Sequence, residues 1–222
     1  MKYPDLRMYN LSISLLLLSF GVAQAREFRL HGNAAFRLSQ DHSTDSRASL
    51  NGFSAEEGRD VHSPPPVWPD TFHALLTGNT SRGLQIVDLW YDWPRGRNAN
   101  LIQSQHDPDG ILYDLEYNNG TTYYFHPETA TNECTAIPMG VGILPPDWLK
   151  NATYLGRETV DQYECDKWTK ADFITYWADV TTGHPVRWIF LEDFMDMNVI
   201  RFEVGAVMPD SKWQLPSTCF HS

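Results

Sequence analysis

Two acidic side chains stand at a spacing that suits acid–base chemistry. Asp114 and Glu116 lie on either side of one residue in the segment LYDLEYNNGTTYYF (residues 112–125). Because side chains alternate between the two faces of a strand, both carboxyl groups fall on one face, where they could seat two acids near a sugar. No partner carboxylate can be placed from the sequence, so we interpret this face as a solvated one.

The other candidates for chemistry are weaker. Asp107 with Asp109, and Asp193 with Asp196, lie in apparent turns, where aspartate commonly accepts hydrogen bonds from its own backbone. The sequence contains no nucleophile elbow, zinc-protease helix, phosphate-binding loop or dinucleotide fingerprint. We therefore predict no catalytic residues, no metal site and no cofactor.

The N-terminal segment has the features of an export signal. Lys2 and Arg7 precede an apolar run from Leu11 to Val22, and Ala23-Gln24-Ala25 is a small-residue cleavage site. The apolar run is about a dozen residues long, whereas a membrane-spanning helix needs roughly 20. We therefore predict a signal peptide over residues 1–25 and no integral membrane segment in the mature chain.

Three acceptor patterns for N-linked sugars follow this signal. They begin at Asn79, Asn119 and Asn151. Behind a signal peptide, such patterns predict exposed, glycosylated loops. The predicted destination is the secretory pathway, with the extracellular space and a vacuolar or endomembrane lumen as the alternatives.

Composition and charge narrow the class of protein. Hydrophobic residues make up 42% of the 222 residues and aromatic residues 13%, which indicates a packed globule rather than a disordered chain. The formal net charge is −11. This acidity argues against nucleic acid or an anionic membrane as a partner, because both require clustered lysine and arginine.

Three cysteines give an odd number of thiols. Cys134, Cys165 and Cys219 allow one disulfide with one thiol left over. On the chain-entropy model the three pairings would contribute between about 3.7 and about 4.6 kcal/mol, which is too narrow a range to choose among them. The residues alone leave the pairing open.

The mature chain divides into a leader and a folded part. Residues 26–66 are polar, have no sustained period and end in three prolines, so we interpret them as a flexible leader. Residues 67–222 show short apolar runs about ten residues apart, which is typical of a single antiparallel all-β domain. We expect one short helix over Pro69–Leu76. The expected strands cover residues 84–91, 100–105, 112–117, 121–125, 163–167, 173–180, 186–191 and 199–208.

The turn at Asn119-Gly120 allows two strand registers. A two-residue loop pairs Tyr117 with Thr122 and separates the aromatic rings of the hairpin between its faces. A three-residue loop with Gly120 in the left-handed conformation pairs Tyr117 with Thr121 and gathers the apolar side chains on one face. We favour the three-residue loop and expect its rings to line the inside of a curved sheet.

The apolar strand faces have two interpretations. They pack as a solid core, which is the usual role of aromatic sheet faces, or they enclose a cavity for an apolar guest. The second interpretation predicts ligand-binding side chains on four strands. These side chains are Tyr113, Leu115, Tyr123, Phe125, Trp188, Phe190, Phe202 and Val204.

Six segments together resemble a family of secreted plant proteins that has no assigned activity and has sometimes carried a label of glycosyl-group transferase. The resemblance runs in order from Trp68 to Phe220. The segments are VWPDTFHALL, LQIVDLWYDWPRGRNANLIQ, YDLEYNNGT, DWLKNATYLG, HPVRWIF and FEVGAVMPDSKWQLPSTCF.

Three segments are more distantly similar to the ependymin-related proteins. They are GTTYYFHPETATNEC, PPDWLKNATYLG and RFEVGAVMPDSKWQLPSTC. The resemblance implies a half-barrel like that of bacterial lipoprotein carriers, in which an antiparallel sheet curves around an apolar cavity that binds a lipid. It also implies a disulfide between Cys134 and Cys219, with Cys165 unpaired.

We therefore predict a secreted all-β half-barrel that binds a hydrophobic or amphiphilic small molecule without transforming it. One alternative is a glycan-modifying enzyme that transfers glycosyl groups, for which a cavity lined by Asp114, Glu116 or Asp193 would be evidence. The other alternative is a structural interaction module of the cell exterior, for which a solid core would be evidence.

Overall fold

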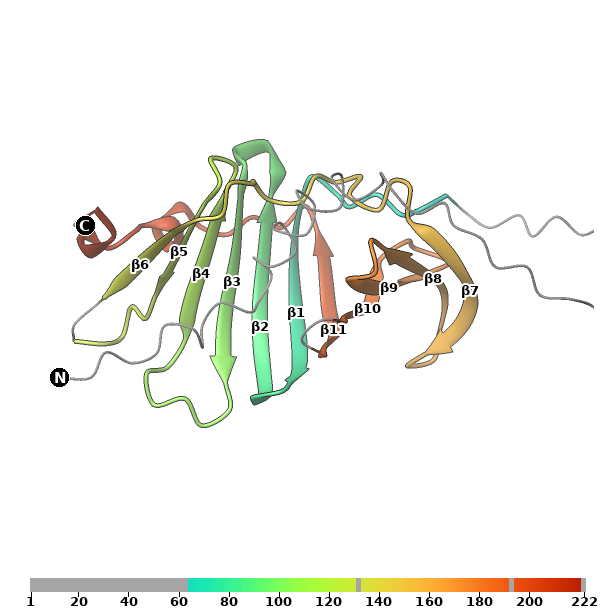
Figure 1. Cartoon of the computed structure of the whole chain (residues 1–222), viewed down its shortest axis with the longest axis horizontal. Helices are drawn as coiled ribbons and strands as arrows, with labels where there is room; N and C mark the ends of the chain where they lie inside the picture. The colour runs from blue at the N-terminus through green and yellow to red at the C-terminus, as the bar shows by residue number, and fades with distance from the viewer. Residues whose placement is uncertain (1–63, 131–132, 192–193, 221–222) are drawn as a thin grey trace, which may run out of the picture.

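The computed structural model describes residues 64–130, 133–191 and 194–220 (Figure 1). The predicted signal peptide and all of the predicted leader except its three prolines lie outside these residues. None of the described segments forms a helix that is long and apolar enough to cross a membrane.

The described residues form one sheet of eleven strands, with three short 3-10 helices. The strand order is β6-β5-β4-β3-β2-β1-β11-β10-β9-β8-β7, and every neighbouring pair is antiparallel. The strands are β1 (Thr71–Thr80), β2 (Gly83–Asp92), β3 (Arg97–Ser104), β4 (Leu112–Tyr117), β5 (Thr121–Phe125), β6 (Cys134–Pro138), β7 (Thr153–Val160), β8 (Tyr163–Lys170), β9 (Ile174–Asp179), β10 (Pro185–Phe190) and β11 (Met195–Val204); the 3-10 helices are η2 (Trp93–Arg95), η3 (Asp210–Trp213) and η4 (Ser217–Phe220).

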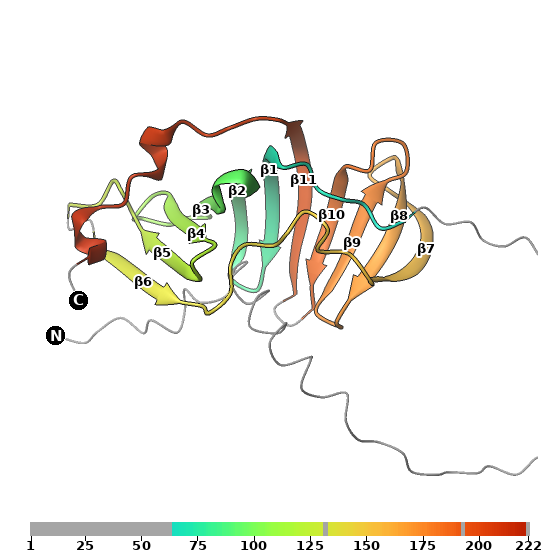
Figure 2. The ribbon, with the colours of Figure 1, turned by 90° about the horizontal axis from the view of Figure 1, so that it is seen from above.

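The sheet consists of two meanders, β1–β6 and β7–β11, that join where β1 pairs with β11. The outermost strands, β6 and β7, are not paired with each other, so the sheet is curved but open (Figure 2). Residues 139–152, which we call the strap, connect β6 to β7 across one face of the sheet, while residues 205–220 return along the other face (Figure 2). The predicted all-β antiparallel fold is confirmed.

The predicted helix over Pro69–Leu76 is wrong, because this segment opens the central strand β1. Phe72, Ala74 and Leu76 are buried on one face, while His73 is buried on the other. Burial of side chains on both faces removes the polar alternation that would have revealed a strand. A short apolar run of this kind is ambiguous between helix and strand.

The predicted three-residue turn of the β4–β5 hairpin is confirmed. Leu115 pairs with Tyr123 across the two strands, which is the register that this turn requires. Gly120 has a φ of 80° and its N–H donates to the carbonyl of Tyr117 at 2.9 Å. A Cβ atom at this glycine would also lie 3.2 Å from the backbone nitrogen of Val141 in the strap.

The last predicted strand, residues 199–208, differs from β11 in two ways. A bulge opposite Leu75 and Leu76 leaves Ile200 out of the pairing and exposed. The strand then ends at Val204, and Gly205 donates its N–H to the carbonyl of Thr71 at 2.8 Å. The predicted alternation of apolar residues therefore stops before Met208.

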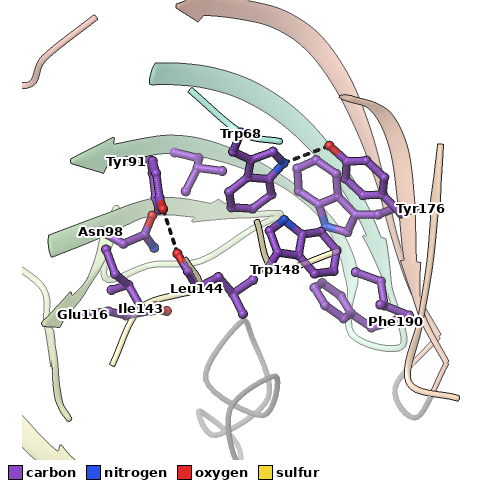
Figure 3. Close-up of a pocket in the computed structure, with 12 residues that line it drawn as sticks. Trp68, Tyr91, Asn98, Glu116, Ile143, Leu144, Trp148, Tyr176 and Phe190 are labelled. Atoms are coloured by element: carbon purple, nitrogen blue, oxygen red, sulfur yellow. Dashed lines mark hydrogen bonds between the residues drawn. The ribbon is translucent and has the colours of Figure 1, made fainter. Parts of the chain in front are cut away.

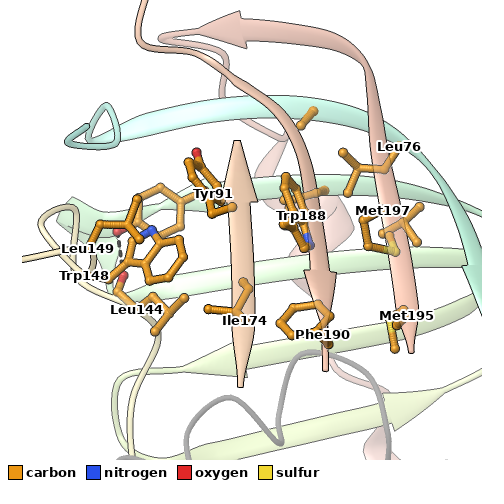
Figure 4. Packing of buried hydrophobic residues seen from close by; sticks show 14 of the residues in the cluster. Leu76, Tyr91, Leu144, Trp148, Leu149, Ile174, Trp188, Phe190, Met195 and Met197 are labelled. Atoms are coloured by element: carbon orange, nitrogen blue, oxygen red, sulfur yellow. Dashed lines mark hydrogen bonds between the residues drawn. The ribbon is translucent and has the colours of Figure 1, made fainter. Parts of the chain in front are cut away.

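The two faces of the sheet carry separate hydrophobic clusters. The inner cluster spans β1, β2, β3 and β8–β11 and includes residues of the strap (Figure 4). The strap therefore covers this face, which is the concave face of the sheet. The outer cluster lies on β3–β6 beneath residues 205–220. The members of the outer cluster include Ala99, Leu115, Phe125, Met208, Trp213 and Cys219.

A disulfide joins Cys134 of β6 to Cys219 of η4, as the resemblance to ependymin-related proteins implied. It attaches the C-terminal segment to the edge of the sheet. The free cysteine, Cys165, is fully buried, and burial raises the pKa of its thiol to about 11. Because the thiolate is the reactive form, Cys165 is an inert structural residue.

His73 connects the two meanders on the outer face. One imidazole nitrogen faces the Asp88 carboxylate of β2, and Nδ1 lies 2.7 Å from Oε2 of Glu203 on β11. The ring stacks on Trp90 with centroids 4.0 Å apart. The hydrogen bond from His73 is the main cause that lowers the pKa of Glu203.

Replacing His73 with phenylalanine should lower the midpoint of thermal unfolding by a few degrees while keeping the stack on Trp90. A carboxylate with a lowered pKa contributes stability above its ordinary pKa of about 4.3 and loses that contribution as the pH falls through the lowered value. The difference in the midpoint of thermal unfolding between wild type and H73F should therefore shrink when melting curves are recorded from pH 6 down to pH 3. A constant difference over this range would contradict the assignment.

Candidate functional site

The inner face and the strap enclose an apolar cavity (Figure 3). Strands β2, β9 and β10 form its floor, and the strap forms its cover, with Trp68 beside it. Two polar residues, Asn98 and Glu116, lie at one end. The other lining residues are Trp68, Leu89, Tyr91, Ile143, Leu144, Trp148, Ile174, Tyr176, Trp188 and Phe190.

The enclosed space is small. Its volume is about 30 Å³. A water needs at least roughly 10–15 Å³, so this space holds little more than one or two waters. An apolar guest of any size therefore requires the cover to move.

Aromatic rings in edge-to-face contact hold the cover in place. The ring centroid of Trp68 lies 5.4 Å from that of Trp148 and 5.5 Å from that of Tyr91. Trp148 stands perpendicular to Tyr176 at 5.3 Å. Trp68 also donates its Nε1 hydrogen to the hydroxyl of Tyr176 at 2.9 Å (Figure 3). Such ring pairs contribute about 0.5–1.5 kcal/mol each beyond their buried area.

None of the described residues of the strap belongs to a strand, and hydrogen bonds to the rest of the chain hold it at several points along its length. The hydroxyl of Tyr91 donates to the carbonyl of Leu144 at 2.7 Å (Figure 3). The ammonium group of Lys170 donates to the backbone carbonyls of Trp148 and Lys150. The strap packs closely against the β4–β5 hairpin at Gly142. A Cβ atom at this glycine would lie 2.6 Å from the side-chain oxygen of Asn118.

Two buried acids lie at the polar end of the cavity, Glu116 on its wall and Asp114 two residues earlier on the same face of β4. Asp114 and Glu116 are 0% and 3% exposed, so the prediction of a solvated face is wrong. They pair across strands with Asn100 and Asn98, which share the inner face. The side-chain nitrogen of Asn100 donates to Asp114 Oδ2 at 3.2 Å and to Glu116 Oε1 at 3.3 Å. The hairpin is buried on both faces, and the sequence shows only that one face is polar.

Burial perturbs both carboxyl groups in the same direction. Removal from water raises the pKa of Asp114 to about 7. The same cause raises the pKa of Glu116 well above its ordinary range, and the nearby charge of Asp114 raises it further. The pair therefore holds protons at pH values where exposed carboxyl groups are ionised.

Replacing Asp114 with asparagine should flatten the pH dependence of stability. With a folded-state pKa of about 7, above the ordinary value of about 3.9, the wild-type folded state binds more protons than the unfolded chain between these pH values. Its stability therefore falls as the pH rises. D114N should be the more stable protein at pH 8 in urea unfolding, and its advantage should be smallest near pH 4. Glu164→Gln, at an exposed strand position, is the control. Parallel curves of unfolding free energy against pH for wild type and D114N would contradict the raised pKa of Asp114.

The predicted ligand-binding side chains lie on both faces of the sheet. Trp188 and Phe190 line the cavity. Phe202 packs its ring 4.8 Å from that of Phe72, and Val204 is 57% exposed at the end of β11. The four hairpin side chains belong instead to the outer cluster, beneath the C-terminal segment. These are Tyr113, Leu115, Tyr123 and Phe125.

The expectation that the hairpin rings line the inside of the sheet is therefore wrong. The register was correct, but the residues that share its apolar face pack against Met208 and Trp213. No local pattern in the sequence indicates that Trp68, Trp148 and Tyr176 form the cavity, because Trp68 and Trp148 lie outside strands and all three come from segments that are distant in the sequence.

Comparison with known proteins places the chain in a family. Residues 67–219 match the family described as "Domain of unknown function (DUF8395)". The chain belongs to this family. A search of the curated proteins found no match.

Two solved structures share part of the arrangement of this DUF8395 protein, both at 10% identity. One is an uncharacterized conserved protein from Thermus thermophilus, with a TM-score of 0.49 over 67% of this chain and 87% of that chain. The other is a DUF1329 family protein from Desulfovibrio piger, with a TM-score of 0.30 over 66% of this chain and 90% of that chain.

The remaining predicted sites have the following positions in the DUF8395 fold. Asn79, Asn119 and Asn151 are all exposed, and their glycosylation stays a prediction. Asp107 accepts a hydrogen bond from the backbone of Asp109 at 3.0 Å, as expected of a turn. Asp193 lies outside the described residues, while its proposed partner Asp196 forms an ion pair with Arg187 at 2.6 Å. Within the described part of the chain, no three histidine, cysteine or acidic side chains are placed to hold a metal ion.

Proposed function

We propose that this protein binds a hydrophobic or amphiphilic small molecule between the inner face of the sheet and the strap, without changing it chemically. The observation that carries the proposal is the cavity itself, whose floor is a hydrogen-bonded sheet and whose cover is an irregular segment. A guest enters by displacing the strap from the aromatic rings of the cavity floor. The guest then contacts these rings in place of the strap.

Binding of the guest exchanges one set of apolar contacts for another. The strap buries Ile143, Leu144 and Trp148 against the floor of the cavity. Displacing them exposes apolar area on both sides, at about 25 cal/mol per Å². A bound hydrocarbon chain of similar area covers the cavity floor again, and so offsets the part of the cost that comes from exposing the floor. The sheet keeps its own backbone hydrogen bonds throughout. The movable part is therefore the segment without strand pairing.

The proposed setting is the secretory pathway. The disulfide between Cys134 and Cys219 is consistent with an oxidising compartment. The exposed positions of Asn79, Asn119 and Asn151 leave room for the proposed sugars. A protein that carries a lipid through such a compartment needs this kind of covered apolar site.

One observation favours a glycan-modifying enzyme as the alternative. Glu116 lines the cavity, and Asp114 shares the amide nitrogen of Asn100 with it. Sugar hydrolysis or transfer needs two carboxyl groups beside a polar substrate. Here almost every other lining residue is apolar, which supports binding of a hydrocarbon chain over binding of a sugar.

Native mass spectrometry of the protein purified from secreting cells tests the proposal. We expect a lipid-sized adduct on the wild type. Leu89→Phe, which fills the hollow from the floor, should lose it, whereas Ile86→Phe, at an exposed position on the same strand, should retain it. A wild-type protein without an adduct that also ignores fatty acids and fluorescent lipid probes would refute the proposal. Turnover of oligosaccharides that disappears in Glu116→Gln would establish the enzyme instead.

A further inference from the structure

The polar end of the cavity is rich in hydrogen-bond acceptors. Asp114, Glu116, Asn98 and Asn100 are each at most 5% exposed, and Glu116 and Asn98 lie on the cavity wall. Among the described residues, the side chains that donate to the two carboxyl groups are the asparagines, which are uncharged. The acid pair is therefore buried without a cation of its own.

Two buried acceptor atoms at this site lack a hydrogen-bond partner. They are Oδ1 of Asp114 and Oδ1 of Asn100, which are both 0% exposed and sit opposite each other on paired strands. Buried polar groups in folded proteins are nearly always satisfied, so unpaired acceptors beside a cavity indicate a partner from outside the chain.

We propose that the acid pair at the end of the cavity binds the ammonium group of an amine-bearing amphiphile, whose hydrocarbon chain occupies the apolar part. The inference rests on the proposed function, because it assigns the polar end of the same guest. A primary ammonium group carries three donors and a positive charge. It would meet the free oxygens of Asp114 and Asn100 together with the carboxyl group of Glu116.

Other polar ends suit the site less well. A fatty acid would bring a carboxylate, which has no N–H or O–H donor for the unpaired oxygens and would be buried without a cation. A hydroxyl group has one donor and forms neutral hydrogen bonds, which are roughly half as strong as charge-assisted ones. A quaternary ammonium group has no N–H donor for the unpaired oxygens.

Binding of an ammonium group should release a proton from the pair. The empty site holds protons near neutral pH because burial raises the pKa of both carboxyl groups. A bound positive charge favours the ionised carboxylate, so a proton moves from the carboxyl group to solvent as the amine binds. An alcohol carries no charge and leaves the protons in place.

Calorimetric titration of the full-length protein with decylamine, decanol and decanoate, each kept below its micelle concentration, tests the inference. We expect decylamine to bind at least about tenfold more tightly than decanol, and decanoate to bind most weakly. Titration at pH 6 in two buffers of different ionisation enthalpy should show a release of about one proton for decylamine and none for decanol.

The double variant Asp114→Asn/Glu116→Gln should bind decylamine and decanol equally and release no proton, while Glu164→Gln should behave as the wild type. If the double variant does not fold, the proton release of the wild type decides the question alone. Equal binding of the three probes by the wild type, or a preference for decanoate, would overturn the inference and leave the proposed function standing. Failure of all three probes to bind would overturn both.

Discussion

Replacing Cys134 and Cys219 together with serine should lower the free energy of unfolding by about 4.6 kcal/mol, from the chain entropy that a bridge over 85 residues removes from the unfolded state. The bridge ties η4 to β6, an edge strand that has a neighbour on one side only. Its loss also frees residues 205–220 to leave the outer cluster.

The measurement is urea unfolding followed by tryptophan fluorescence, with Ser217→Ala as the control on the same turn. Ser217 is exposed and takes no part in the bridge, so the control should match the wild type. The fluorescence of the inner-face tryptophans should change less than that of Trp213, which belongs to the released segment. A double variant as stable as S217A would show that the bridge contributes nothing to the fold.

Replacing Trp148 with alanine should cost about 3–5 kcal/mol of stability and leave a cavity large enough for an apolar probe, because Trp148 is the strap residue that lies 3% exposed against the cavity. A ligand that binds only the folded state then restores part of that stability. At a hundred times its dissociation constant, decanol should restore about 2.7 kcal/mol.

The matched control is Trp213→Ala on the outer face. Trp213 is 5% exposed and packs beneath the guanidinium of Arg97, 4.3 Å from its ring. Its removal should cost a similar amount of stability, but the space opens toward the C-terminal segment rather than the cavity. Equal recovery of both variants with decanol, or recovery of neither, would contradict the assignment of the strap as the cover.

The sequence was sufficient for the kind of fold and for much of its local geometry. Strand spacing indicated an antiparallel all-β protein, and the gathering of apolar residues selected the register of Leu115 with Tyr123. The resemblance to ependymin-related proteins supplied the pairing of Cys134 with Cys219. These features depend on local pattern, on turn chemistry or on resemblance to another family, all of which can be read from a sequence.

The site depends on contacts between distant segments, which a local pattern does not reveal. Period-two alternation says which residues share a face, but not which face becomes concave. Asp114 and Glu116 were therefore interpreted as solvated, although both are buried and Glu116 lines the cavity together with residues of the strap. The short run at β1 was expected to be helical because it lacks the polar alternation of a strand. The alternation is missing since Phe72 and His73 are buried on opposite faces of a central strand.

The central claim is that a guest binds beneath the strap on the inner face, and photo-crosslinking with a diazirine-bearing decyl probe tests it most directly. After irradiation and peptide mapping, we expect adducts in the strap, at residues 143–149, and on β9 and β10, including Phe190. Adducts confined to the outer cluster, at Tyr113 or Tyr123, or the absence of adducts that an unlabelled lipid can displace, would contradict it.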